Sequence, residues 1–234
     1  MWSWHRRVRC FNWSDHNWAI TLLVNREIEK HSSILRGQVF DLGRGTQPYR
    51  RFIESLGCTY VGVDWEHSYH KPHPDLIADL NQRFPMDAAI ADTVLAISIL
   101  EHLREPGLFL EEAYRILRPG GYLVLQVPFQ WPVHEEPFDY FRFTSFGLDH
   151  LARKAGFPSP HIHAGTGFWI TLVMRANDYL LRGVRGPRAV KWLVRALLVP
   201  IWFGDQMLAL LLDKLDPTEG HTSSYTLVAS KPKL

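Results

Sequence analysis

Three residues at alternate positions, Asp41, Gly43 and Gly45, follow a short strand-like run in the stretch Val39–Tyr49. Glycine removes the Cβ atom where a chain turns sharply, and it lets a ligand come close to the backbone. Asp41 could accept hydrogen bonds from a ligand that carries a cation or an amine. A dinucleotide site would need a third glycine where Gln47 stands, and no lysine follows as in a phosphate-binding loop. The stretch therefore predicts a ligand-binding turn rather than a phosphate cradle.

A second acid, Asp64, closes the next strand-like run, TYVGVDW at residues 59–65. An acid at the end of the second strand of an α/β domain can accept hydrogen bonds from both hydroxyls of a ribose. A solvated acid in a turn is the alternative interpretation. Because the glycine turn comes just before it in the chain, we favour ribose binding.

The stretch Val127–Leu148 combines polar and aromatic side chains at a density that is usual in functional loops. It follows the strand-like run YLVLQVP, so we expect it to lie over the mouth of the ligand site. His134 could remove a proton from a neutral nucleophile, because a histidine pKa near about 6.5 suits this task at neutral pH. Glu135 or Asp139 could orient His134 or replace it.

Other side chains of this loop are candidates for contact with a second ligand. Arg142 could bind an anionic ligand, or it could simply pair with Asp139. Trp131 and Tyr140 are the aromatic candidates. In the plainer alternative, the aromatic side chains cover the edge of the sheet and the charged ones are solvated.

Strand-like runs alternate along the chain with helix-like segments, and most of the strand-like runs are continuously apolar. The predicted strands cover residues 37–43, 59–65, 75–80, 92–100, 122–128 and 224–230. The predicted helices cover residues 17–34, 46–57, 106–121 and 145–157. This pattern predicts a doubly wound α/β fold with a mostly parallel sheet covered on both faces. Ligands of such sheets bind beyond the carboxyl ends of the strands, where Asp41, Asp64, Asp79 and Ser98 are expected.

The composition is that of a globular protein: of 234 residues, 46% are hydrophobic and 21% charged. A formal net charge of +2 is too small to indicate a nucleic-acid partner. The two cysteines, Cys10 and Cys58, do not form a metal-binding motif, and the histidine pairs lack matching Cys or acid spacing, so no metal is expected. No secretory signal is recognisable at the N-terminus, which favours a cytoplasmic location.

Five motifs, in order and spacing, resemble those of class I S-adenosylmethionine-dependent methyltransferases. They are VFDLGRGT, VGVDW, ADLNQRFP, DTVLAISILEHL and EAYRILRPGGYLVLQVP, and the similarity covers roughly residues 37 to 157. Each motif is weak alone, and their combination is specific. The resemblance implies a methyltransferase that takes S-adenosyl-L-methionine as its cofactor. The loop after residue 128 also looks like that of bacterial methyltransferases associated with the synthesis of surface glycans and lipid-linked sugars.

The resemblance implies a role for each matching residue. Gly43 and Gly45 would pass under the methionine part of the cofactor, with Asp41 near its amino group, and Asp64 would hold the ribose. The remaining cofactor contacts would be Asp79, Leu80 and Ser98, near the adenine edge and the cofactor's other side. His102, in LEHL, is a further candidate base, although in this family it more often helps to build the wall below the fourth strand.

The C-terminal third suggests an inserted element. Five basic residues and no acid lie between Arg182 and Arg195, followed by the apolar run ALLVPIWFGDQMLALLLDKLD. Pro200 and Asp205 interrupt this run, so we expect no transmembrane helix. Residues 182–212 could form a helical pair packed on the core or on a second subunit, or an element at the membrane surface.

The sequence therefore predicts one domain over residues 1–234. Its parts would be an N-terminal helical segment (1–36), a cofactor-binding core (37–165), a helical insertion (166–221), and the last strand and tail (222–234). The expected function is methyl transfer to an oxygen of a small-molecule or carbohydrate acceptor, and a lipid-linked acceptor is one alternative. The expected location is the cytoplasm or the inner face of the membrane. The alternative is a non-catalytic scaffold in a glycan-assembly system, and the oligomeric state stays open.

Overall fold

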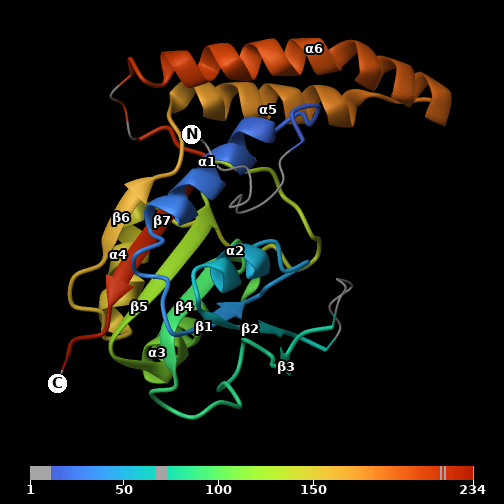
Figure 1. Cartoon of the computed structure of the whole chain (residues 1–234). Helices are drawn as coiled ribbons and strands as arrows, with labels where there is room; N and C mark the ends of the chain where they lie inside the picture. The colour runs from blue at the N-terminus through green and yellow to red at the C-terminus, as the bar shows by residue number, and fades with distance from the viewer. Residues whose placement is uncertain (1–11, 67–72, 217, 219, 234) are drawn as a thin grey trace.

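The computed structural model describes residues 12–66, 73–216, 218 and 220–233 (Figure 1). Cys10 and the first part of the expected N-terminal segment lie outside the described residues. The helices are α1 (Trp18–Lys30), α2 (Arg50–Ser55), α3 (Pro106–Ile116), α4 (Ser145–Lys154), α5 (Phe168–Gly183) and α6 (Arg188–Leu212), with a single 3-10 turn, η1 (Leu100–His102). The strands are β1 (Gln38–Leu42), β2 (Thr59–Asp64), β3 (Leu76–Ile77), β4 (Ala91–Ile97), β5 (Leu117–Pro128), β6 (His161–Ala164) and β7 (Ser224–Ser230).

The seven strands form one sheet in the order β3-β2-β1-β4-β5-β7-β6. The first five strands run parallel, and β7 inserts antiparallel between β5 and β6. The predicted doubly wound, mostly parallel α/β fold is confirmed. Chain order reverses between β1 and β4, which is where such sheets open a crevice for a ligand.

Helices cover both faces of the sheet, as the continuous apolar strands require. On one face, Ile28 of α1 and Phe52 and Ile53 of α2 pack in a cluster with Val39 of β1. On the other face, α3 and α4 bury Phe109, Leu110, Ala113, Leu148 and Ala152 against the sheet. The sheet is thus held rigidly from both sides, with its carboxyl edge left for the loops.

The strands differ from the prediction in three places. Strand β6 was missed because its residues, HIHA, are only partly buried and it pairs with β7 alone, at the edge. Strand β3 shrinks to two residues because Asp79 accepts hydrogen bonds from Asn81 and Gln82 and turns the chain there. The helix expected to reach residue 121 ends at Ile116, because Leu117 already pairs with Ala91 and the next residues form an irregularity in β5.

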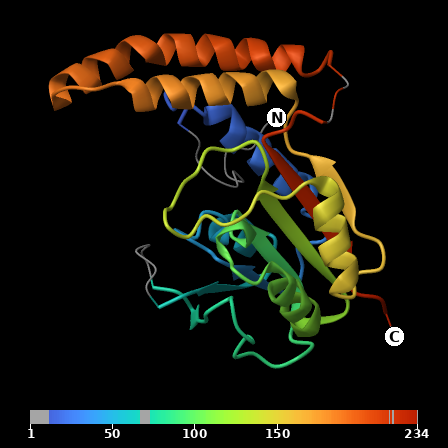
Figure 2. The same ribbon diagram turned by 180° about the vertical axis from the view of Figure 1, so that it is seen from behind.

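Helices α5 and α6 form a hairpin that lies beyond the sheet on the side where β5 ends (Figures 1 and 2). The base of the hairpin packs on α1, where Trp18, Ala19, Ile170 and Ala209 form a buried cluster. Asp213, just after α6, accepts hydrogen bonds from the backbone N–H groups of Gly167, Trp169 and Ile170 and so caps α5.

Pro200 and Asp205 interrupt the apolar run of the sequence but do not break the helix. Helix α6 runs through both positions for 25 residues, and by length and composition it is long and apolar enough to cross a membrane. Burial of Trp202 and Gln206 beside Pro200 holds the helix together, and the Gln206 side chain bonds both Ala19 N–H and Trp202 C=O. Most of the helix surface stays exposed.

Candidate active site

The glycine turn takes the conformation that its residues predict. Gly43, Gly45 and Gln47 all have positive φ, at 76°, 51° and 58°. Gln47 therefore occupies the left-handed region in which a third glycine would be unstrained. Gly43 is needed for a second reason, because a Cβ atom there would lie 2.4 Å from Cγ1 of Ile99. The turn after β1 thus packs directly on the loop after β4.

Asp41 lies inside the protein rather than at its surface. Its carboxylate accepts a 2.5 Å hydrogen bond from the Tyr60 hydroxyl, and the residue is 2% exposed. Burial raises the pKa of Asp41 to about 7, although the Tyr60 hydrogen bond and the charge of Arg44 act against this rise. Asp41 is therefore buried against Tyr60 of β2 rather than exposed at the edge of the sheet.

The other predicted cofactor residues lie along the carboxyl edge of the sheet. Asp64 ends β2 and accepts a hydrogen bond from Trp65 N–H at 2.9 Å. Asp79 is exposed, and hydrogen bonds from Asn81 and Gln82 help to lower its pKa against the opposing effect of burial. Leu80, in contrast, has its side chain in the core.

Ser98 occupies the turn after β4 with a φ of 51°. Its hydroxyl donates to the Gln126 side-chain oxygen at 2.9 Å, and its N–H donates to Gln126 C=O. Both bonds tie the end of β4 to β5. Ser98 itself is exposed at the edge where the glycine turn and Ile99 meet.

The loop from Phe129 to Phe143 is held by one ion pair. The Arg142 guanidinium makes two hydrogen bonds to the Asp139 carboxylate, at 2.5 and 2.7 Å. It also donates to the carbonyl oxygens of Trp131, Pro132 and Phe141. The pairing with Arg142 lowers the pKa of Asp139 to about 2. The structure thus places Arg142 and Asp139 as the internal brace of the loop.

The same loop extends back across the sheet edge toward β2. The Phe138 ring meets the Trp65 ring edge-on, with centroids 5.5 Å apart. Tyr140 N–H donates to Glu101 C=O at 2.9 Å, and the Tyr140 side chain is exposed. Trp131 is partly buried at the start of the loop. The loop therefore crosses the carboxyl edge of the sheet and contacts the segments that follow β2 and β4.

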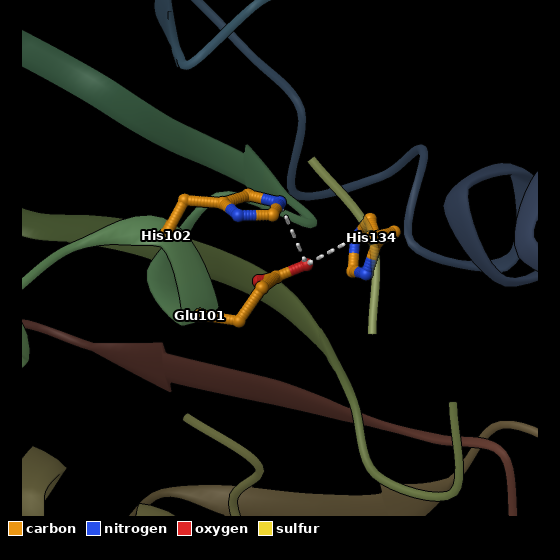
Figure 3. Close-up of side chains that lie close together, drawn as sticks. All are labelled: Glu101, His102 and His134. Carbon is orange, nitrogen blue, oxygen red and sulfur yellow. Dashed lines mark ion pairs between the residues drawn. The ribbon is translucent and has the colours of Figure 1, made fainter. Parts of the chain in front are cut away.

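Three titratable side chains converge beneath the loop (Figure 3). Glu101 and His102 come from η1, and His134 comes from the loop after β5. Glu101 Oε1 lies 3.7 Å from His102 Nε2 and 3.9 Å from His134 Nε2. Glu101 is fully buried, and burial raises its pKa to about 8. Burial, followed by the neighbouring His102, lowers the pKa of His134, which is therefore neutral at physiological pH.

The structure brings the three predicted catalytic residues together. His134 lies in the cluster, and Glu135 stands at its exposed rim, with Oε2 3.8 Å from His102 Nε2. Asp139 reaches His134 through the backbone N–H, at 2.9 Å, and lies 3.3 Å from its Nδ1. Sequence reasoning missed Glu101, although its place in LEHL beside His102 was a usable signal.

Comparison with known proteins identifies the core. A family model for the methyltransferase domain matches residues 40–125. The matched residues run from β1 into β5, within the predicted cofactor-binding core. Over 131 residues it is 24% identical to a probable S-adenosylmethionine-dependent methyltransferase of Mycolicibacterium smegmatis. That alignment covers 51% of each protein, so the chain spans about half the length of this curated relative.

Solved structures of methyltransferases have the same fold as this chain. An S-adenosylmethionine-dependent methyltransferase from Archaeoglobus fulgidus superposes with a TM-score of 0.59 at 15% identity, over 90% of this chain and 94% of that one. Phosphoethanolamine N-methyltransferase 2 of Haemonchus contortus, solved with phosphomonomethylethanolamine and S-adenosylhomocysteine, gives 0.56 at 15% identity, over 92% of this chain and 57% of that one. The predicted class I methyltransferase fold is thereby confirmed.

Proposed function

We propose that this protein binds S-adenosyl-L-methionine and transfers its methyl group to a hydroxyl of a small-molecule or carbohydrate acceptor. The observation that carries the proposal is the convergence, at one edge of the sheet, of the glycine turn, Asp64 and the Glu101–His102–His134 cluster. The relative from M. smegmatis is named for dependence on the same cofactor. When bound, this cofactor supplies an electrophilic methyl group, so the protein mainly positions the two partners and excludes water.

The residues of the turn fit this cofactor. Gly43, Gly45 and Gln47 give the close-approach backbone that the methionine part requires, and buried Asp41 supports that backbone from behind. Asp64 follows at the end of the next strand, where it holds the ribose hydroxyls. Asp79 and Ser98 complete the exposed edge on either side, and Leu80 packs behind them in the core.

His134 is the proposed base for the acceptor hydroxyl. Its Nδ1 faces the carbonyl oxygen of Pro132 at 3.2 Å and the carboxylate of Asp139, so this nitrogen carries the proton. The lone pair then sits on Nε2, which faces the cluster. A neutral alcohol is a poor nucleophile, and such a lone pair can take its proton. Trp131, Tyr140 and Glu135 line the approach, and Arg142 acts by bracing the loop.

Calorimetric titration with S-adenosylmethionine and S-adenosylhomocysteine tests the cofactor assignment. We expect binding in the micromolar range, and we expect Asp64→Ala to weaken it about 10–100-fold, which corresponds to the loss of roughly 1.5–3 kcal/mol from hydrogen bonds to a charged group. Asp87→Ala is the matched control, because it removes an exposed acid before β4, at the opposite edge of the sheet. Equal affinity of the two variants would reject the ribose role of Asp64.

The α5–α6 hairpin favours an acceptor at a membrane surface. Helix α6 exposes large apolar side chains along its length, including Trp192, Leu197, Ile201 and Leu208. Arg185 in the turn between the helices, and Arg188, Lys191 and Arg195 in the first part of α6, are all exposed. Apolar and basic groups on one element match an anionic lipid surface.

The position of the hairpin links this surface to the site. Arg175 of α5 donates to the Gln130 side chain, at the start of the loop that covers the cluster. Figures 1 and 2 both show the hairpin on the side of the sheet where that loop lies. We therefore place the protein at the inner face of the membrane, with a lipid-linked sugar as the leading acceptor class.

Flotation with anionic vesicles tests the membrane contact. At low salt the protein should float, and the double variant R185S/R188S should bind about 30-fold more weakly, because each basic residue near the surface contributes about 1 kcal/mol. R51S/R83S, which removes two arginines far from the hairpin, should float like the parent. Absence of flotation at low salt would reject the membrane contact and leave the cofactor proposal untouched.

The rival function is a non-catalytic scaffold with this fold, since a fold alone does not fix a function. The replacement of a third glycine by Gln47 was the feature that favoured it, and the positive φ of Gln47 removes that argument. Failure of both calorimetric titrations would favour the scaffold.

A further inference from the structure

With Glu101 ionised, as a metal ligand must be, the three side chains beneath the acceptor loop present only hydrogen-bond acceptors to one another. His102 Nδ1 faces the carbonyl oxygen of Phe138 at 3.0 Å, and His134 Nδ1 faces that of Pro132. A carbonyl oxygen accepts only, so each Nδ1 carries the ring proton. Both Nε2 atoms therefore hold lone pairs, and both point at the Glu101 carboxylate (Figure 3).

The Glu101 carboxylate is also unsatisfied. Among the described residues, neither of its oxygens has a hydrogen-bond partner, and the side chain is fully buried. The separations of 3.7 and 3.9 Å to the two histidines are too long for hydrogen bonds. A water molecule has two protons and could satisfy only two of three convergent acceptors. A cation satisfies all three.

We propose that Glu101, His102 and His134 bind a divalent first-row transition-metal ion, with Zn²⁺ as the best match. Two imidazole nitrogens and one carboxylate are a set found at catalytic zinc sites, which keep a further position open. Magnesium and calcium prefer oxygen ligands. The carbonyl groups that hold each Nδ1–H have the role of outer partners that orient metal-binding histidines.

The spacing suits such an ion after a small adjustment. The three ligand atoms lie within 4.8 Å of one another. Ligand atoms on a tetrahedral ion with bonds of about 2.0–2.2 Å lie roughly 3.3 Å apart. The separations of 3.7 and 3.9 Å from Glu101 need to close by roughly half an ångström, and the pair of histidine nitrogens, within 4.8 Å, by up to roughly 1.5 Å. Glu101 is fixed by the Tyr140 N–H bond to its carbonyl, so the histidine on the loop supplies most of this movement.

For the reaction, this inference rests on the proposed function. The open position of the ion faces the loop, where the acceptor hydroxyl would bind and lose its proton more readily. His134 would then be a ligand, and the proton would pass to exposed Glu135 at the rim. The reaction would thereby become sensitive to chelators.

Titration of the metal-stripped full chain with Co²⁺ and Zn²⁺, without a methyl donor, tests the site. We expect one ion per chain, with the visible absorption of Co²⁺ bound by nitrogen. Glu101→Gln and His134→Asn should each weaken binding at least about tenfold, because outer partners alone change affinity by about 10–100-fold. His163→Asn is the matched control, since it removes a histidine paired with Glu27 at 2.6 Å on the far side of β7.

The result that overturns the proposal is no ion bound at millimolar metal, or binding that both cluster variants leave unchanged. Two variants are used so that misfolding of one, checked by circular dichroism, leaves the other decisive. Metal binding is read independently of S-adenosylmethionine. If the chain binds the ion but not the cofactor, the metal site is supported and the methyltransferase function is rejected. If it binds the cofactor but not the ion, the metal site is rejected and the methyltransferase function is kept.

Discussion

The contact between the glycine turn and the loop after β4 makes a quantitative prediction about Gly43. Its φ of 76° is in the region that costs an L-residue about 1–2 kcal/mol. A Cβ atom would also lie 2.4 Å from Cγ1 and 2.7 Å from Cδ1 of Ile99, an overlap of the kind that typically costs about 1–3 kcal/mol. Gly43→Ala should therefore lower the free energy of unfolding by roughly 2–5 kcal/mol.

Gly57 separates the two contributions. Its φ of 81° nearly equals that of Gly43, but nothing lies within 4 Å of the position of its Cβ atom. Gly57→Ala should therefore cost only the conformational part, about 1–2 kcal/mol. Urea unfolding of the two variants measures the difference directly. In thermal unfolding, each kcal/mol corresponds to about 2–4 °C for a chain of this size.

A third variant tests the identity of the contact. Ile99→Ala removes the overlapping Cγ1 and Cδ1 atoms. Gly43→Ala should therefore cost less stability when it is added to the Ile99→Ala variant than when it is made in the parent protein. S-adenosylmethionine affinity should fall in Gly43→Ala and stay unchanged in Gly57→Ala. If the two glycine variants lose the same stability within about 0.5 kcal/mol, the Ile99 contact does not limit the turn and the argument fails.

Three further outcomes follow from the geometry. Gln47→Gly relieves a left-handed residue and should leave stability within about 1 kcal/mol of the parent, with cofactor affinity retained; a calorimetric loss of binding would show that the Gln47 side chain itself contacts the cofactor. Asp139→Asn should lower the free energy of unfolding at pH 7 by roughly 2 kcal/mol, because the pKa of Asp139 in the folded state, about 2, lies below its value in the unfolded state. The stabilisation by ionised Asp139 is complete above about pH 4 and is lost as the pH falls toward 2. Urea unfolding at both pH values should show the gap between parent and variant closing at the lower pH. Asp213→Ala removes the acceptor for three backbone N–H groups at the start of α5 and should cost about 1–2 kcal/mol, whereas Asp216→Ala, at an exposed turn, should be near neutral in the same assay.

The doubly wound, mostly parallel sheet and the positions of Asp41 and Asp64 near the ends of its strands could be predicted because they depend on local patterns. Apolar runs that end in Asp41 and Asp64, and helices that end near glycines, carry their own signals. Strand β6 carried none, since HIHA has no apolar alternation and exists only because β7 offers an edge to pair with. Helix α6 continues through Pro200 because Trp202 packs on the N-terminal segment and Gln206 accepts a hydrogen bond from Ala19 N–H. These contacts outweigh the effect of the proline.

The cluster beneath the loop shows a second limit. Glu101 and His134 are far apart in the sequence, and no spacing rule connects them. His134 was selected for its residue type alone, and Glu101 was overlooked because a glutamate inside a 3-10 turn looks solvated in the sequence. Burial is a property of the folded chain, and here the loop from β5 creates it. The backbone bond from Tyr140 to Glu101 is the contact that closes the cover.

The cap that Asp213 places on α5 has a consequence for how such proteins diversify. Because the residue after the second helix secures the start of the first, the hairpin leaves and rejoins the sheet at nearly one point. Its length, tip charge and apolar face can therefore change through insertion or deletion without moving β6 or β7. Related chains could therefore carry different hairpins at this position. Each hairpin would bind a different surface, while the site at the ends of β1, β2 and β4 stays the same.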